Sequence, residues 1–134
     1  MQNFTIEKET AEEIISLSVT KNDKNALVNY NVENVPFSYN SEACQKKISI
    51  LDYANLEKEV QNLSLEKIFQ ENLGSVFLDG WTLRFSERSG STELKIEVQC
   101  PSKSESKPET MKLLDFCEKV FVVVGNLGEF FPEK

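Results

Sequence analysis

Regular alternation of apolar and polar residues predicts two neighbouring strands in the first quarter of the chain. In the stretch EEIISLSVT, Ile15, Leu17 and Val19 alternate with serines, which is the period of a half-buried strand. The run from Ala26 to Val32 alternates in the same way. The letters KNDKN between the two runs have the composition of a turn. We therefore expect an antiparallel hairpin here.

The segments on either side of this hairpin carry weaker strand signals. Phe4 and Ile6 have strand spacing close to the N-terminus. Phe37 and Tyr39 predict a short edge strand beyond the hairpin. The letters SEACQKK that follow are interpreted as a loop.

The apolar spacing changes to a helical period in the middle of the chain. The residues that carry this pattern are Leu56, Val60, Leu63, Leu65, Ile68, Phe69 and Leu73. They predict one amphipathic helix, or two short helices joined near Asn62 and Ser64. Asp52 is the expected N-cap of this segment, and Gly74 is placed to end it.

A second pair of alternating runs predicts another hairpin around Gly90. The apolar positions are Phe77, Trp81, Leu83 and Phe85 on the way out, and Leu94, Ile96, Val98 and Cys100 on the return. The letters SERSGST between the runs predict a flexible turn. Trp81 is expected in the core because its neighbours on that face are apolar. Asp79 and Gly80 before it predict a turn or a bulge.

A last helix is predicted from Pro108 onwards, since proline and Glu109 suit the first turn of a helix. Its apolar stripe consists of Leu113, Leu114, Cys117, Val120, Phe121 and Val124. Gly125 is the expected cap. Phe130 and Phe131 beyond it either pack on the core or are exposed.

Together these elements predict an α+β fold. We expect an antiparallel sheet of about four to six strands with helices packed on one of its faces. The length of 134 residues fits a single domain, residues 1–134. The hydrophobic share of 40% is enough for a packed core.

The charge balance indicates which partners to expect. The formal net charge is −7, which disfavours nucleic acid and anionic membranes and favours a basic protein partner. The first residues lack the basic start and apolar run of a signal peptide. No apolar run is long enough to span a membrane. A cytoplasmic location is the expectation.

The residue types disfavour an enzyme. Histidine is absent, which excludes Ser-His-Asp and Cys-His nucleophilic sites. The three cysteines show no CxxC spacing, so we expect small buried residues in a reducing compartment rather than disulfides or zinc ligands. Glu57 and Glu59 are too close in sequence to face each other across a helix turn. We expect no catalytic residue, no cofactor and no metal.

The remaining charged residues of the second hairpin are Arg84, Glu93, Lys95 and Glu97. Their positions alternate with the apolar residues of the same two runs. We interpret them as the solvated face of the hairpin, because surface strands commonly carry charge on one side.

A family resemblance rests on residues shared between the second hairpin and the last helix. These residues are Asp79, Gly80, Trp81, Leu83, Pro108, Met111 and Leu114. The order of an Asp-Gly strand with a tryptophan, a return strand and a Pro-led helix resembles the small bacterial immunity proteins of polymorphic and contact-dependent toxin systems. In this chain the tryptophan follows the glycine directly, and CPSKSESKP precedes the helix.

The resemblance implies a non-catalytic inhibitor that binds a cognate toxin domain. Toxins that are nucleases have basic substrate clefts, which an anionic protein would approach quickly. The candidate contact residues are the acidic residues of the predicted helical segment, Asp52, Glu57, Glu59, Glu66 and Glu71.

Two alternatives remain open at this stage. An acidic secretion chaperone or adaptor would bind an extended effector protein along its sheet, although such chaperones usually begin with a helix and this chain begins with strands. An enzyme would need two carboxyl groups that converge in one pocket. A monomer favours the immunity protein and a homodimer favours the chaperone.

Overall fold

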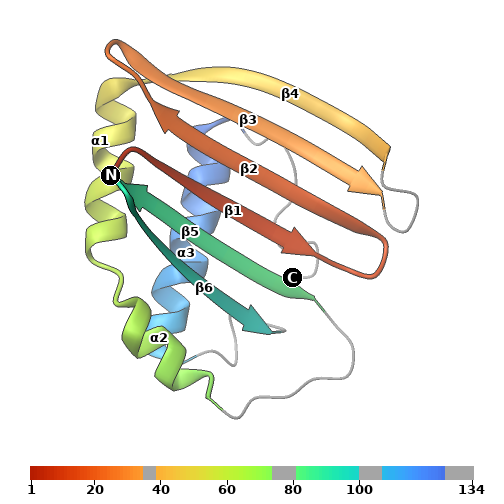
Figure 1. Ribbon diagram of the computed structural model, residues 1–134, viewed down its shortest axis with the longest axis vertical. Helices are drawn as coiled ribbons and strands as arrows, with labels where there is room; N and C mark the ends of the chain where they lie inside the picture. The colour runs from red at the N-terminus through yellow and green to blue at the C-terminus, as the bar shows by residue number, and fades with distance from the viewer. Residues whose placement is uncertain (35–38, 74–80, 100–106, 126–134) are drawn as a thin grey trace.

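A computed structural model describes residues 1–34, 39–73, 81–99 and 107–125. Within them, six strands form one antiparallel sheet with the order β4-β3-β2-β1-β5-β6 (Figure 1). The strands are β1 (Asn3–Glu9), β2 (Glu13–Lys21), β3 (Asn25–Asn34), β4 (Tyr39–Ser49), β5 (Thr82–Ser89) and β6 (Thr92–Gln99). The predicted α+β class and the antiparallel sheet are confirmed.

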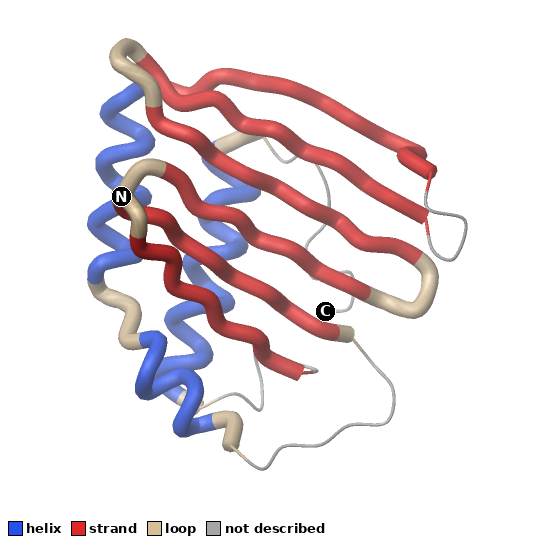
Figure 2. Tube along the Cα trace, viewed as in Figure 1, coloured by secondary structure: helices blue, strands red, loops and turns tan. Residues whose placement is uncertain are grey.

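The helices of the described chain lie together behind the sheet and leave its other face open (Figures 1 and 2). They are α1 (Ile50–Gln61), α2 (Leu65–Glu71) and α3 (Pro108–Val123). Aromatic rings fill the space between the sheet and α3. The ring centroid of Phe116 lies 5.5 Å from that of Phe4 and 5.7 Å from that of Phe85. This apolar layer is the core of the protein.

The hairpin predicted in the first quarter of the chain is confirmed. Leu17 and Val19 of β2 are fully buried, and the apolar residues of β3 alternate with more exposed ones. Asn22 closes the turn, because its Oδ1 accepts the backbone N–H groups of Lys24 and Asn25 at 3.0 and 2.9 Å. Such asparagine turns replace backbone hydrogen bonds that a tight reversal would lose.

The segment SEACQKK is not a loop, as its composition had suggested, but part of β4. This strand pairs with β3 from Asn25↔Ser49 onwards, with an irregularity after Val32. Its pattern is mostly polar because only Ile48 on it is buried among the side chains described there. The strand lies at an edge of the sheet, and edge strands commonly carry polar and charged side chains, which discourage pairing of the free edge with another chain.

Helix starts in the middle segment differ from the prediction in one respect. Ser49, not Asp52, is the N-cap of α1, and its Oγ accepts the N–H of Asp52 at 3.0 Å. A serine oxygen is a strong cap, so Asp52 falls in the first helical turn instead. The alternative of two short helices is confirmed, and Ser64 caps the second by accepting the N–H of Lys67 at 3.3 Å.

Two residues of the predicted apolar stripe lie in solvent. Phe69 is 56% exposed and Leu73 is 62% exposed. The seven-residue helix α2 touches β6 and α3 and buries Ile68 against them. So short a helix presents one narrow line of residues to its neighbours, which leaves Phe69 outside the contact, and Leu73 lies beyond the end of the helix.

The second hairpin has a tighter turn than predicted. Only Gly90 and Ser91 separate β5 from β6, and Gly90 has a φ of 61° that suits glycine. Trp81 packs partly buried against the core, and the Nζ of Lys8 lies 4.7 Å from its ring centroid. Expectations for Phe37, Gly74, Phe77, Asp79, Gly80, Cys100, Phe130 and Phe131 fall outside the described residues.

Helix α3 begins and ends as the sequence predicts. Pro108 occupies its first turn, and Gly125 follows it with a φ of 95°. The Nζ of Lys46 on β4 donates to the carbonyl oxygen of Val124 at 2.7 Å. A cation at this end complements the partial negative charge of the helix C-terminus. Lys46 therefore ties the sheet to the end of α3.

We predict that Lys46→Gln lowers the free energy of unfolding by about 1 kcal/mol, because a cation is lost from a helix C-terminus. The matched control is Lys47→Gln, at the next position and on the exposed side of β4. Urea titration measures both variants. Equal losses in the two variants would contradict the role of Lys46.

Candidate functional site

The open face of the sheet displays its side chains in rows that cross the strands. Alternate residues of each strand point to this face, and the register places them side by side. We name each row by its residue on β1. The Thr5 row is Gln45, Asn29, Ser18, Thr5, Ser86 and Lys95, and the Glu7 row is Ala43, Asn31, Ser16, Glu7, Arg84 and Glu97.

Two further rows lie outside these. The Asn3 row is Lys47, Leu27, Thr20, Asn3, Arg88 and Glu93, and the Glu9 row is Glu33, Ile14, Glu9, Thr82 and Gln99. Hydroxyl, amide and charged groups dominate all four rows. The open face is therefore a polar surface, whereas the opposite face of the same strands is apolar.

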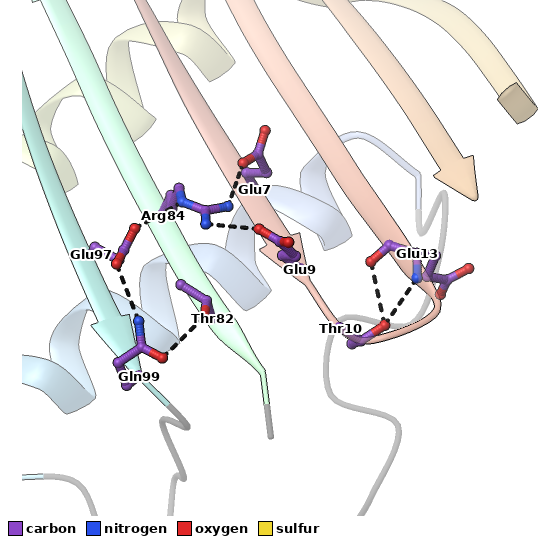
Figure 3. A network of polar contacts seen from close by, with 8 residues as sticks. All are labelled: Glu7, Glu9, Thr10, Glu13, Thr82, Arg84, Glu97 and Gln99. Atoms are coloured by element: carbon purple, nitrogen blue, oxygen red, sulfur yellow. Dashed lines mark hydrogen bonds and ion pairs between the residues drawn. The ribbon is translucent and has the colours of Figure 1, made fainter. Parts of the chain in front are cut away.

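One guanidinium on this face is held by three carboxylates, as Figure 3 shows. Arg84 Nη1 lies 2.8 Å from Glu7 Oε1, Nη2 lies 2.7 Å from Glu9 Oε1, and Nε lies 2.9 Å from Glu97 Oε2. We call these four residues the arginine cluster. The hydrogen bond with Glu9, followed by those with Glu97 and Glu7, raises the pKa of Arg84 above its ordinary value. The cluster carries a net charge of −2.

Neighbouring side chains hold the cluster in place (Figure 3). Gln99 Nε2 donates to Glu97 Oε1 at 3.1 Å, and the hydroxyl of Thr82 lies 3.1 Å from Gln99 Oε1. Where β1 turns into β2, the hydroxyl of Thr10 accepts the N–H of Glu13 at 3.2 Å. Polar groups that are already positioned lose less entropy when a partner binds them.

Among the hollows on the described part of the face, two lie between the Thr5 and Glu7 rows. One, of about 380 Å³, is bordered by Glu7, Arg84 and Lys95 on β1, β5 and β6. The other, of about 370 Å³, is bordered by Asn29, Asn31 and Gln45 on β3 and β4. The small side chains of Ser16 and Ser18 stand on β2 between the hollows. The described part of the face therefore includes open recesses beside β2.

The structure disperses the acidic residues predicted as a contact face. Glu57 lies 3.1 Å from the N-terminal ammonium, and Glu59 lies 2.8 Å from Lys119 on α3. Glu71 binds the start of α3. Asp52 and Glu66 remain exposed on two different helices. Three of the five residues are thus engaged within the chain, and the role of the set in binding stays a prediction.

Glu71 acts as a cap that comes from another helix. Its Oε2 accepts the N–H of Glu109 at 3.0 Å, and its Oε1 accepts the N–H and the hydroxyl of Thr110, both at 2.8 Å. Burial raises the pKa of Glu71, but these hydrogen bonds and Lys107 outweigh it, so that the pKa is below its ordinary value of 4.5. The side chain of Lys107, the N-cap residue of α3, makes no capping hydrogen bond. Glu71 therefore supplies the acceptor oxygens that the free N–H groups at the start of α3 need.

We predict that Glu71→Gln lowers the free energy of unfolding by about 1 to 2 kcal/mol at about pH 7, as loss of a charged cap does. A lowered pKa in the folded state stabilises the fold above the unfolded value and ceases to do so as pH falls through the folded value. The difference between variant and wild type should therefore shrink towards about pH 3.

Urea titration at the two pH values measures this effect. Glu66→Gln is the matched control, because it removes the same charge from an exposed position of the same helix. A loss for Glu71→Gln that stays equal at both pH values would contradict the charged cap.

The fully buried cysteine among the described residues, Cys117, offers no reactive thiol. Cys44 and Cys117 are both free, and burial raises the pKa of the Cys117 thiol far above its ordinary value. Such a thiol stays protonated and unreactive. The expectation of a small buried residue is confirmed for Cys117.

In residues 1–34, 39–73, 81–99 and 107–125, no three His, Cys, Asp or Glu side chains are placed to hold a metal ion. Among the helices described, none is both long and apolar enough to cross a membrane.

Comparison of the chain with protein-family models, curated proteins and solved structures finds no match. The geometry of the open face is therefore the basis on which a function can be argued.

The sequence indicated part of this face and missed the rest. Arg84 and Glu97 alternate with buried residues, which predicted a solvated face for their hairpin. Their meeting with Glu7 and Glu9 depends on the pairing of β1 with β5, which joins residues far apart in the chain. The alternation of apolar and polar residues within β1 could have placed Glu7 and Glu9 on one exposed face. It could not indicate which strand pairs with β1.

Proposed function

We propose that this chain is a non-catalytic protein that binds and neutralises a cognate toxin domain, and that the open face of its sheet makes the contact. The observation that carries the proposal is the arrangement of this face: ordered rows of hydroxyl, amide and charged groups on a sheet whose other face is covered by helices. The resemblance to immunity proteins in the second hairpin and last helix supports the class.

The size of the face suits a protein partner. The six described strands have seven to eleven residues each. At about 4.8 Å between strands and about 3.4 Å per residue, with about nine residues per strand, the face measures roughly 29 by 31 Å, or about 880 Å². A specific protein complex buries about 800 Å² on each partner. Side-chain relief adds to the flat area, so one partner protein could use the whole face.

The composition of the face suits two proteins that fold separately and then associate. Permanent interfaces are rich in apolar groups, whereas interfaces between independently folded proteins are about as polar as the remaining surface. Ser16, Ser18 and Thr5 lie at the centre of the face. Their short side chains would let a partner approach the strands closely, while Asn29 and Gln45, joined at 2.8 Å, offer further hydrogen-bonding groups.

The net charge of −7 supports a basic partner. Opposite charges on two proteins accelerate their encounter. A nuclease toxin fits this requirement, since its substrate cleft must attract phosphate groups. Covering that cleft would block the toxin without any reaction by the inhibitor.

Growth rescue tests the proposal. Cells express a toxin domain encoded next to this chain, together with wild-type chain or with one of two variants. We predict that wild type restores growth and that Ser18→Trp does not, because the bulky ring would stand at the centre of the face and hold a partner away. Asn55→Trp, on the exposed side of α1, is the matched control and should restore growth.

Thermal unfolding verifies that both tryptophan variants are folded. Rescue by Ser18→Trp at wild-type level would contradict the use of the open face. Failure of the wild-type chain to rescue would contradict toxin neutralisation. If that failure came with a stable homodimer in light scattering, the secretion chaperone would become the better proposal.

A further inference from the structure

The charges of the open face are separated into two halves, and this separation specifies the partner further. Among the described residues, the Glu7 and Glu9 rows together carry four carboxylates, Glu7, Glu9, Glu33 and Glu97, and one cation, Arg84, for a net charge of −3. The Asn3 and Thr5 rows carry Lys47, Arg88 and Lys95 against Glu93, for a net charge of +2. The open face therefore changes from a basic half near Asn3 to an acidic half near Glu9.

We infer that the open face recognises a protein surface of matching polarity, with cationic side chains opposite the arginine cluster and anionic ones opposite Lys95 and Arg88. This inference rests on the proposed function and adds to it the chemistry and the orientation of the partner. Complementary charges fix the register between two proteins as well as their rate of encounter.

The arginine cluster has capacity for further cations. Each of Glu7 and Glu9 contacts Arg84 through one oxygen, Oε1. A carboxylate can accept several hydrogen bonds, so the second oxygens can receive a lysine or arginine from a partner. Because three carboxylates share one guanidinium, the cluster keeps excess negative charge in a small area.

The five acidic residues predicted as a contact face do not offer an equivalent concentration. Glu57, Glu59 and Glu71 are engaged with the N-terminus, with Lys119 and with the start of α3. Asp52 and Glu66 lie on separate helices. Exposed charges separated by more than about 10 Å act weakly on one another in physiological salt. A cationic group should therefore prefer the arginine cluster to these five residues.

The hollow beside the arginine cluster lies at the boundary between the two halves. Glu7, Arg84 and Glu97 border it from the acidic half, and Thr5, Ser86 and Lys95 border it from the basic half. A side chain of the partner that enters this hollow would meet hydrogen-bonding groups of both kinds. A partner side chain in this hollow would therefore contact both halves, and these contacts would favour one orientation of the partner.

A second copy of this chain is a weaker occupant than a different protein. A two-fold axis along the rows would set acidic halves against basic halves, so the face is partly self-complementary. Each copy, however, carries a net charge of −7, and like net charges oppose association. A partner with a basic patch gains from both the local pattern and the net charge.

Nuclear magnetic resonance titration with two short peptides tests the polarity without the toxin. The probes are tetra-arginine and tetra-glutamate, each added to the full chain at low ionic strength. Tetra-arginine should shift the amides of Glu7, Glu9 and Arg84, and tetra-glutamate should shift those of Arg88 and Lys95. The double variant Glu7→Gln with Glu9→Gln should weaken tetra-arginine binding at least about threefold, because two charges next to the bound cation are lost.

The matched control removes two charges from the helices, as Asp52→Asn with Glu66→Gln, and should change tetra-arginine binding by less than about 1.5-fold. Equal weakening in both double variants, or shifts centred on the helices, would overturn the inference. Shifts at the open face that depend on protein concentration without peptide, with a dimer in light scattering, would also overturn it in favour of a second copy. Growth rescue tests toxin neutralisation separately, so the two failures can be told apart.

Discussion

The contact between helix α3 and one face of the sheet is the interaction on which the rest of this structure depends. Phe4 and Phe85 from adjacent strands meet Phe116 of α3 in the core. Aromatic side chains bury large apolar areas and pair with defined geometry. Loss of one such side chain from a core typically costs about 3 to 5 kcal/mol. Charged contacts then secure both ends of α3, through Glu71 at its start and Lys46 at its end.

The same alternation that builds the core also builds the candidate site. Burying Phe4 and Ile6 of β1 places Thr5, Glu7 and Glu9 on the opposite face. A shift of one residue in register would exchange the two faces, which the buried side makes costly. The hydrophobic core therefore holds the arginine cluster in its position, although none of the cluster residues belongs to the core.

Net charge and charge position make different contributions to the proposed function. The excess of acidic residues supports attraction to a basic protein. Several acidic residues on the helices nevertheless serve the architecture, as Glu71 and Glu59 show. The open face carries fewer net charges but arranges them in two halves. Such a pattern favours one orientation of a partner, which a uniformly acidic surface would not.

The sequence alone determined the elements whose pattern is local. Alternation identified the hairpin of β2 and β3, helical spacing identified the helical segment that contains α1 and α2, and Pro108 and Gly125 marked the ends of α3. The tertiary structure decided what depends on distant residues. It made a strand of the polar segment in β4, left Phe69 in solvent, turned Glu71 into a cap, and brought Arg84 to Glu7 and Glu9. Periodicity records which side of an element is buried, whereas only the packing of elements determines which neighbour each side meets.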